Sequence, residues 1–302
     1  MRGGGVGAAV VMARVAYLTG RSFAGAPFAP GEVHPLEEKS RELIAAAGAK
    51  RGMAFEVKYW DENLAGFDAA VIRSCWDYHL RPQHFIETLE AHERAGVRVF
   101  NPPAVVRWNS RKTYLKDLGA AAIETVWVER ADARTVAQAF DALDASEIVV
   151  KPQIGAGSVE TVRLKRNAWS EADLIAGPQG AAMIQPFLRA IETEGERSLF
   201  WFGGVYSHAV RKVPKGGDWR ANIPGETRFV VEAPPAAAME AAEAARARAP
   251  GDLLYVRIDL VLGDDGAWRV IEIEAIEPYL FLDFAPEGAD VFAGAIARVL
   301  GV

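Results

Sequence analysis

Two apolar runs lie near the C-terminus, YVRIDLVL at residues 255–262 and WRVIEIEAI at residues 268–276. β-Branched residues dominate both runs, and the linker GDDG at residues 263–266 is typical of a tight turn. The two runs therefore predict a β-hairpin. A hairpin closed symmetrically about its two turn aspartates places Asp259 directly opposite Val270. Glu272 is then the diagonal neighbour of Asp259 on the other strand, about 7–8 Å away. A bulge in either strand would change this register.

Three acidic residues interrupt these strands: Asp259, Glu272 and Glu274. Side chains alternate in direction along a strand, so the two glutamates share one face, and Asp259 is expected beside them. Three carboxylates on one patch raise one another's pKa unless a cation lies among them. Mg²⁺ prefers oxygen ligands and completes its shell with water and phosphates, so the pattern favours a magnesium site that serves a nucleoside triphosphate. The alternative is a solvated strand face whose acids are neutralised by Arg257 and Arg269.

The overall composition is that of a globular protein of two or three domains, with 302 residues, half of them hydrophobic. A formal net charge of −6 argues against a nucleic-acid partner. No run approaches the roughly 20 apolar residues of a membrane span. The lone cysteine, Cys75, excludes an internal disulfide and fits a cytoplasmic location. Residues 1–12, MRGGGVGAAVVM, predict a disordered leader rather than a signal peptide, with Met12 as an alternative start.

Strands and helices alternate in the N-terminal third. Strands are predicted at residues 14–18, 53–60, 67–73 and 97–100, and helices at residues 36–48 and 82–94. This alternation predicts a small α/β domain with a parallel sheet, and ligands of such sheets bind at the carboxyl ends of the strands. The segment RSCWDY at residues 73–78 occupies that position. Its charged and aromatic side chains are candidates for holding a small polar ligand; equally, Trp76 and Tyr78 cap the sheet.

The remaining two thirds of the chain contain more strands than helices. A helix is predicted over residues 104–118, followed by strands at 124–128, 147–151 and 160–164 with a helix at 133–143. A further strand at residues 183–188 precedes a hairpin at residues 199–210, and an alanine-rich helix covers residues 235–249. This half of the chain is therefore expected to be α+β.

Residues 148–158, IVVKPQIGAGS, form a strand that ends in Lys151 and a loop of small residues. Small residues let backbone N–H groups approach an anion, and the lysine adds a positive charge. The loop is not a Walker motif, because no Gly-Lys-Ser/Thr follows it, and it lacks the third glycine of a dinucleotide fingerprint. A plain hairpin turn explains the segment equally well.

Other segments also suit a nucleotide. The backbone of residues 183–188, MIQPFL, can pair with an adenine edge, and the glutamates at positions 192, 194 and 196 can accept hydrogen bonds from ribose hydroxyls. The hairpin at residues 199–210 delivers Arg211 and Lys212, and the loop KGGDWRAN at residues 215–222 adds further cations. A solvated loop remains the alternative for residues 215–222.

In this order, the segments resemble those of the ATP-grasp superfamily over about residues 13–302. The loop at residues 216–222 is similar to the Gly-Gly-x-x-Arg-x-Asn loop of its glutathione-synthetase-like branch. Residues 73–78, 101–103, 108–109 and 272–282 look like those of ligases that close the cycloserine ring (O-ureido-serine cyclo-ligases). The resemblance implies an ATP-grasp fold with a Rossmann-like domain at residues 13–104 and an ATP-grasp domain at residues 105–302. The latter would comprise a lid subdomain at about residues 120–186 and a C-terminal mixed sheet.

The resemblance also implies roles for matching residues. ATP phosphates would contact Lys112 and Lys151 beneath a lid loop of Gly155, Ala156, Gly157 and Ser158, with adenine at Gln185 and Leu188 and ribose at Glu196. Arg220 and Lys212 would stabilise phosphate charge, and two magnesium ions would lie on Asp259, Glu272 and Glu274. Candidate substrate contacts are Arg73, Trp76, Asp77, Tyr78, Arg211 and Asn222. Glutathione synthetases carry Asn at the position of Glu274, so a third acid is expected to bind metal more tightly here.

The activity implied is that of an ATP- and magnesium-dependent carboxylate–amine ligase acting on a small amino-acid-like substrate. It would form an acyl phosphate that an amine attacks, with ring closure as one form of the reaction. Two alternatives remain: a ligase that adds amino acids to a peptide or protein, and a non-catalytic ATP-binding regulatory protein. The apolar residues 201–202 and 281–284 either pack inside or form a homodimer contact.

Overall fold

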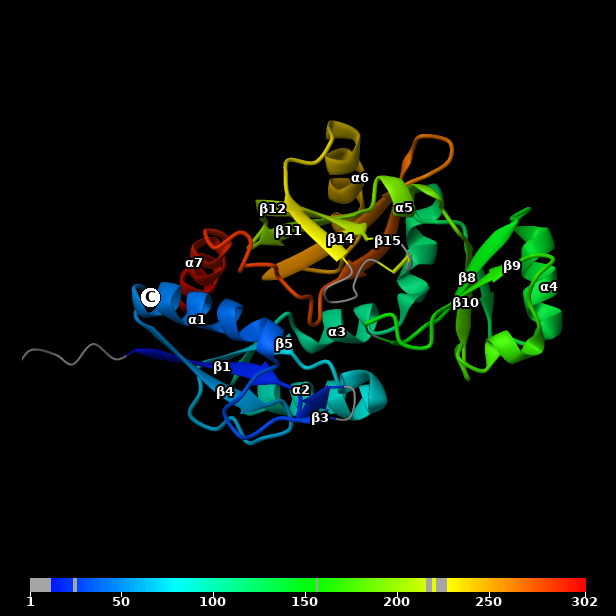
Figure 1. Ribbon diagram of the computed structural model, residues 1–302. Helices are drawn as coiled ribbons and strands as arrows, with labels where there is room; N and C mark the ends of the chain where they lie inside the picture. Colours follow the sequence, from blue (N-terminus) through cyan, green and yellow to red (C-terminus); the bar gives the residue numbers. More distant parts are fainter. Residues whose placement is uncertain (1–11, 24–25, 156, 216–218, 221–226) are drawn as a thin grey trace, which may run out of the picture.

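The computed structural model describes residues 12–23, 26–155, 157–215, 219–220 and 227–302. Its strands form three larger sheets (Figure 1), together with a two-stranded ribbon of β2 (Ser22–Phe23) and β3 (Ala26–Pro27). Except for Met12, the expected leader at residues 1–12 lies outside the described residues. Among the helices described, none has the length and apolarity needed to cross a membrane.

The N-terminal sheet is parallel, as the alternation of strands and helices predicts. Its order is β4 (Met53–Tyr59), β1 (Ala13–Thr19), β5 (Ala69–Ser74) and β6 (Arg98–Phe100). The connections include α1 (Pro35–Ala49), α2 (Pro82–Arg94) and a 3₁₀ turn at Tyr78–Leu80. All six residues of β5 are buried, which is typical of a central parallel strand with both faces covered.

The second sheet lies at the opposite end of the molecule and is antiparallel (Figure 1). Its order is β7 (Val126–Val128), β10 (Ala182–Pro186), β8 (Glu147–Pro152) and β9 (Val162–Lys165). Helix α4 (Ala133–Ala142) packs against it through Val136, Ala139 and Phe140, and a 3₁₀ turn (Glu171–Leu174) precedes β10. Asp132 starts α4 as its N-cap, since its carboxylate accepts a hydrogen bond from the Thr135 N–H at 2.8 Å.

The third sheet has the order β13 (Thr227–Val231), β12 (Val205–Pro214), β11 (Glu196–Phe202), β14 (Tyr255–Leu262) and β15 (Trp268–Glu274). This sheet, expected to be mixed, is antiparallel at every described strand pair, and hairpins join β11 to β12 and β14 to β15. The one parallel pairing described there is an isolated bridge between Ala122 and Val270. Helices α5 (Ala190–Thr193) and α6 (Ala236–Arg246) belong to this half, and α6 packs on β14 and β15.

The single helix expected over residues 104–118 is broken in two. Helix α3 spans Pro103–Asn109, and a 3₁₀ segment spans Lys112–Ala121. The break follows from hydrogen bonds that the residues on either side of it form with distant parts of the chain. The Asn109 side-chain amide bonds to the backbone of β15, and the Lys112 N–H bonds to the Gln153 carbonyl at 2.9 Å. A continuous helix would use that N–H internally and point the two side chains differently.

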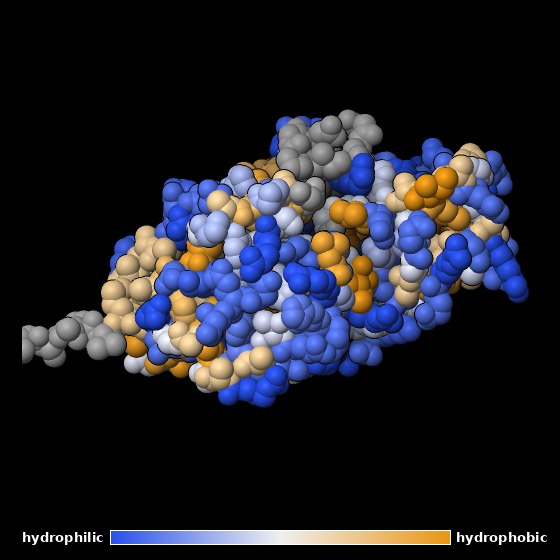
Figure 2. All heavy atoms as spheres, turned by 90° about the horizontal axis from the view of Figure 1, so that it is seen from below, coloured by the Kyte–Doolittle hydropathy of each residue, from blue (hydrophilic) through white to orange (hydrophobic). Residues whose placement is uncertain are grey.

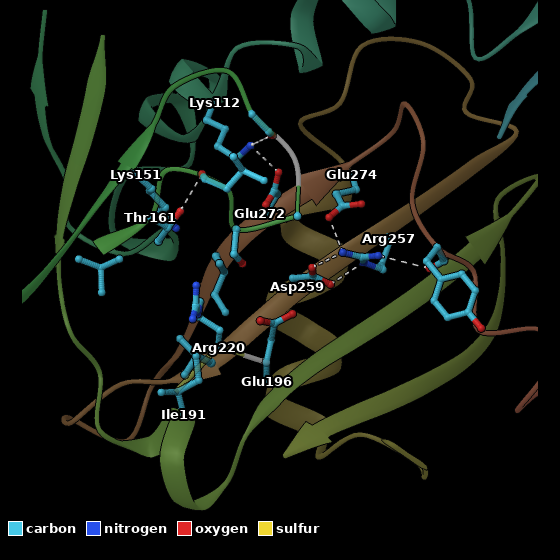
Figure 3. A pocket seen from close by; sticks show the side chains of 18 of the residues that line it. Lys112, Lys151, Thr161, Ile191, Glu196, Arg220, Arg257, Asp259, Glu272 and Glu274 are labelled. Carbon is cyan, nitrogen blue, oxygen red and sulfur yellow. Dashed lines mark hydrogen bonds and ion pairs between the residues drawn. The ribbon is translucent and has the colours of Figure 1, made fainter. Parts of the chain in front are cut away.

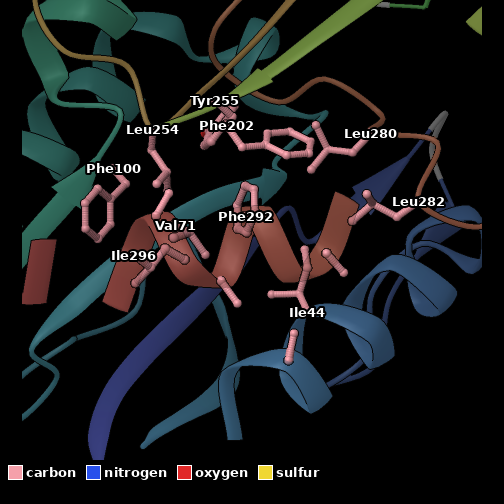
Figure 4. Packing of buried hydrophobic residues seen from close by; sticks show 14 of the residues in the cluster. Ile44, Val71, Phe100, Phe202, Leu254, Tyr255, Leu280, Leu282, Phe292 and Ile296 are labelled. Carbon is pink, nitrogen blue, oxygen red and sulfur yellow. The ribbon is translucent and has the colours of Figure 1, made fainter. Parts of the chain in front are cut away.

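Helix α7 (Gly288–Leu300) joins the first and third sheets through one hydrophobic core (Figure 4). Phe292 and Ile296 belong to the same buried cluster as Ile44 and Val71 of the N-terminal domain and Tyr255 of β14. Burying a side chain of this size contributes about 1.5–3 kcal/mol. The two sheets therefore form one packed unit, and residues at their boundary keep fixed positions.

The apolar residues considered for a dimer contact mostly pack inside. Trp201, Phe202, Phe281 and Leu282 are buried, whereas Phe284 is partly exposed beside the cavity described below. On the face shown in Figure 2, hydrophobic residues show at separate places among hydrophilic ones. Scattered apolar residues of this kind are usual on a protein surface and indicate no docking site.

Candidate active site

A cavity of about 690 Å³ has strand residues of the second and third sheets in its wall, together with residues of α1 and of loops in the N-terminal domain. Fourteen of the sequence-predicted site residues line it: Trp76, Tyr78, Lys112, Lys151, Gly155, Gly157, Ser158, Gln185, Leu188, Glu196, Arg220, Asp259, Glu272 and Glu274. Figure 3 shows ten labelled side chains of this wall. Tertiary structure thus brings together side chains that are up to 200 residues apart, as from Trp76 to Glu274 (274 − 76 = 198).

The register of the C-terminal hairpin differs from the symmetrical one expected. Asp259 pairs directly with Glu272, and Leu260 pairs with Val270, so a bulge leaves Ile271 without a partner of its own. A bulge adds one residue to one strand and turns the following side chains to the other face. As a result, Asp259 lies closer to Glu272 than the diagonal arrangement implies.

The cation among these acids is Arg257. Its guanidinium donates to both carboxylate oxygens of Asp259, at 2.9 and 2.8 Å, and also pairs with Glu274 (Figure 3). Burial alone would raise the pKa of Asp259, but Arg257 and Lys212 hold it well below its usual value. Burial and the like charge of Glu272 raise the pKa of Glu274 to about 7, although Arg257 opposes this. Arg257 therefore lowers the pKa of both acids, and outweighs burial only at Asp259.

The third acid, Glu272, pairs with a different cation. Lys112 Nζ lies 2.9 Å from Glu272 Oε1 and donates to the Gly155 carbonyl at 3.0 Å. Burial opposes the charge on this lysine, but Glu272 outweighs burial and raises the pKa of Lys112. The lysine thus connects the acidic hairpin to the loop of small residues.

The strand that carries Glu272 and Glu274 is held by two polar side chains of the broken helix. The Asn109 amide donates to the Ile273 carbonyl at 2.7 Å and accepts from the Ala275 N–H at 2.8 Å. The Tyr114 hydroxyl donates to the Ile273 carbonyl at 2.8 Å and accepts from the Ile273 N–H at 2.9 Å. These bonds satisfy the free edge of β15 and fix the direction of both glutamates.

Lys151 faces the same cavity from β8 and is more weakly charged than an exposed lysine. Burial lowers its pKa to about 8, and the neighbouring charge of Lys112 acts in the same direction, against Glu272. An anion bound beside it would restore the charge. Four cationic side chains therefore line the cavity, which suits phosphate groups: Lys112, Lys151, Arg220 and Arg257.

The position of Lys212 differs from the one that its expected catalytic role requires. Its side chain has no exposed surface and pairs with Glu196 and, at 3.6 Å, with Asp259. The ammonium lies behind the carboxylates rather than on the cavity wall. Lys212 is thus a positioning residue for Glu196 and Asp259, because it counters their charge from within the sheet.

Two predicted substrate contacts, Arg73 and Asp77, point away from the cavity. Arg73 is fully buried, donates to the Pro278 carbonyl at 2.7 Å and lies 3.4 Å from Glu37. Asp77 accepts from the Arg21 N–H and the Trp60 indole, both at 2.9 Å. Side chains alternate in direction through the end of β5 and the turn after it, so Arg73 and Asp77 bind other parts of the fold while Trp76 and Tyr78 reach the cavity.

Arg211 is also absent from the cavity wall and pairs with Glu232 at 2.8 Å. Ala156 and Asn222 lie outside the described residues, so the structure does not test their predicted roles.

The three carboxylates have the donor chemistry of a site for a hard divalent cation, since their oxygens line the cavity. In the described part of the chain, however, no three Asp, Glu, His or Cys side chains are gathered in a cluster that could hold a metal ion. Instead, the three carboxylates form ion pairs with Arg257 and Lys112. A metal here would have to share the acids with these side chains or displace them.

Several residues of the cavity wall were not predicted. Arg257 was assigned only to neutralising surface acids, although its position two residues before Asp259 on the same strand places both on one face. Glu277 and a group of rings, Phe23, His34, Phe229, Tyr279 and Phe284, also line the cavity. Three of the rings come from loops, and Phe23 and Phe229 from β2 and β13.

A parallel N-terminal sheet, two antiparallel sheets and a cation-lined cavity are together typical of the ATP-grasp ligases. The chain is 33% identical over 273 residues to the cycloserine biosynthesis protein DcsG of Streptomyces lavendulae, covering 82% of this chain and 90% of that protein. A crystal structure of D-cycloserine synthetase DcsG superposes with a TM-score of 0.78 at 28% identity, covering 95% and 99% of the two chains.

The family model of the N-terminal domain of D-cycloserine synthetase DcsG matches residues 15–101. Glutathione synthetase of Ralstonia nicotianae is 26% identical over 79% of this chain and 74% of its own. Solved ATP-grasp ligases at 14–17% identity share the fold. The chain belongs to the DcsG family within the ATP-grasp ligases, and it is an ATP-dependent carboxylate–amine ligase related to cycloserine synthesis.

Proposed function

We propose that the chain closes a ring within a small amino acid, by activating the substrate's carboxyl group as an acyl phosphate that a side-chain nitrogen then attacks. The observation that carries this proposal is the cavity of about 690 Å³ in which cations and carboxylates from the second and third sheets and their connecting segments converge. A cavity of this size suits a nucleotide with a small second substrate. It favours a small acceptor over a peptide or protein.

The reaction has two steps. In the first, a carboxylate oxygen of the substrate attacks the γ-phosphorus of ATP, and the bond to ADP breaks. In the second, the nitrogen attacks the acyl carbon, the C–O bond to phosphate breaks, and phosphate leaves while the nitrogen loses a proton. Positioning and charge neutralisation supply most of the catalysis in phosphoryl transfer, so no side-chain nucleophile is needed.

The cavity residues divide among these tasks. Lys112, Lys151 and the loop at residues 155–158 would hold the phosphates, while Gln185, Leu188 and Glu196 would contact adenine and ribose. Arg257 and Arg220 would stabilise the charge that develops on the transferred phosphoryl group. Asp259, Glu272 and Glu274 would hold magnesium, with two ions expected, and the metal would neutralise triphosphate charge when bound. Such an enzyme would work in the cytoplasm, where ATP is available.

Incubation with ATP, Mg²⁺ and candidate amino acids tests this function. D-Cycloserine is the cyclic amide of β-aminooxy-D-alanine, so this acid and O-ureido-D-serine are the first probes, with D-serine as a control that lacks the side-chain nitrogen. We expect ADP formation and a cyclised product, detected by mass, with one of the first two only. Tight binding of ATP with no ADP formed from any carboxylate would favour the regulatory alternative, and incorporation into peptides would favour a peptide ligase.

The pH dependence of nucleotide binding follows from Lys151. Its pKa of about 8 means that the free protein loses this charge above pH 8, and bound phosphate favours the charged form. Affinity for a non-hydrolysable ATP analogue should therefore fall above pH 8, by at most about tenfold per pH unit. Calorimetry between pH 6.5 and 9.5 measures this, and Lys151→Arg, which stays charged, should remove the fall above pH 8. A flat profile in the unmodified protein would remove Lys151 from the phosphate site.

A further inference from the structure

One acid of the cavity wall has a different environment from the others. Glu272 pairs with Lys112, Asp259 and Glu274 pair with Arg257, and Glu196 pairs with Lys212. Glu277 also lines the cavity, yet its carboxylate forms no hydrogen bond or ion pair with any residue that the structure describes. A partly buried carboxylate without a partner is costly, so a ligand is expected to satisfy it.

The charge balance around Glu277 favours a cationic ligand. Burial raises its pKa well above the usual range, and the like charge of Glu274 adds to this, while Lys112 opposes it. An anionic phosphate would add to the repulsion by Glu274, and a neutral base or sugar would leave the cost of the buried ionised form uncompensated. A positively charged group removes both penalties.

The backbone around Glu277 is held firmly. The Trp76 indole donates to the Glu277 carbonyl at 2.9 Å, Arg73 donates to the Pro278 carbonyl, and the Tyr255 hydroxyl donates to the Ile276 carbonyl at 2.7 Å. These donors come from the N-terminal domain and from β14. Three consecutive carbonyl groups are thus anchored, so the side chain of Glu277 is presented at a fixed place, as a specific binding group requires.

Aromatic rings and the catalytic arginine lie close by. Trp76 and Tyr279 line the same cavity, and Arg257 donates to the Tyr279 carbonyl at 3.3 Å. Ring faces attract ammonium groups, and an arginine attracts a carboxylate. The ammonium and carboxylate groups of an α-amino acid are attached close to each other, through neighbouring carbon atoms. The two protein groups proposed to bind them are also close, because the segment from Glu277 to Tyr279 is short.

We propose that Glu277 binds the α-ammonium group of the substrate and thereby selects an α-amino acid whose carboxyl group lies toward Arg257. This assignment deepens the proposed function and rests on it. It gives Glu277 the task of choosing the substrate, separate from nucleotide and metal binding.

The test compares two probes that differ only in the α-amino group, β-aminooxy-D-alanine and 3-aminooxypropanoate. Their dissociation constants are measured by calorimetry in the presence of Mg²⁺ and a non-hydrolysable ATP analogue. In the unmodified protein the amino acid should bind more tightly. Glu277→Gln should weaken its binding by about 10- to 100-fold, the usual effect of losing a charge-assisted hydrogen bond. Binding of 3-aminooxypropanoate and of the ATP analogue should stay unchanged.

Two controls complete the design. Asp264→Asn makes the same chemical change in the exposed turn between β14 and β15 and should leave both probes unaffected. Glu277→Asp keeps the charge and should retain part of the preference for the amino acid. Circular dichroism melting confirms that each variant is folded.

Equal weakening of both probes by Glu277→Gln, or no weakening of either, would overturn the assignment. Weaker binding of Mg²⁺ with an unchanged preference for the amino acid would also overturn it and make Glu277 a metal ligand. Turnover is measured separately: an unmodified protein that prefers the amino acid but forms no ADP would refute the ligase function and leave the ammonium site standing.

Discussion

Replacing Arg257 with alanine is expected to lower kcat by about 100- to 1,000-fold, the usual effect of removing a donor that stabilises transition-state charge. Arg257 lines the cavity and holds Asp259 and Glu274 at once, so its loss removes a positive charge from the reaction centre and frees two acids. The measurement is steady-state ADP formation at saturating ATP and substrate.

Stability must be measured alongside this loss of activity. Breaking a buried ion pair costs about 3–5 kcal/mol, because the remaining charge is left unpaired. Since Arg257 holds the pKa of Asp259 low, it contributes stability at pH values above the ordinary pKa of an aspartate, and the variant should lose that contribution at neutral pH. Kinetics are therefore compared at a temperature where circular dichroism shows a folded variant.

Arg269→Ala is the matched control for Arg257→Ala. Arg269 lies in the same hairpin but pairs with the exposed turn residue Asp265, and surface pairs of this kind contribute only about 0–1 kcal/mol. It should leave kcat and stability nearly unchanged. A folded Arg257→Ala variant with near-normal kcat would exclude Arg257 from the reaction.

Arg73→Ala should instead lower the free energy of unfolding by about 3–5 kcal/mol. Arg73 and Glu37 are both fully buried and lie 3.4 Å apart, and the Tyr17 hydroxyl donates to Glu37 at 2.7 Å. Removing the arginine leaves a buried carboxylate without its cation and frees the Pro278 carbonyl. Urea denaturation measures the loss, and the double variant Arg73→Met, Glu37→Leu should recover much of it, because apolar side chains replace the pair.

The exposed pair of Arg21 and Asp61 supplies the comparison for Arg73. Arg21 Nη2 lies 2.8 Å from Asp61, and its removal should cost about 0–1 kcal/mol. A raised KM with unchanged stability in Arg73→Ala would restore the substrate role that the sequence suggested for this residue.

The outline of the fold could be predicted from the sequence because it depends on local patterns. Alternation of apolar strands with helices predicts the parallel sheet, and an Asp/Gly turn between apolar runs predicts the C-terminal hairpin, since both are properties of neighbouring residues. The broken helix at residues 110–111 was missed, because Asn109 and Lys112 obtain their partners from β15 and from Gln153, far along the chain.

The sequence by itself determined which residues carry charge and which short segments bear them, because composition and spacing are written in the chain. Only the tertiary structure decided which way each of these side chains points. Trp76 faces the cavity, whereas Arg73, only three residues earlier, faces the core. The reason is that the surrounding helices cover the faces of the sheet but leave its carboxyl edge open. Packing between strands likewise produces the bulge that places Asp259 opposite Glu272, and it brings Arg257 beside Asp259 as the neighbouring cation. No local sequence pattern predicts either feature.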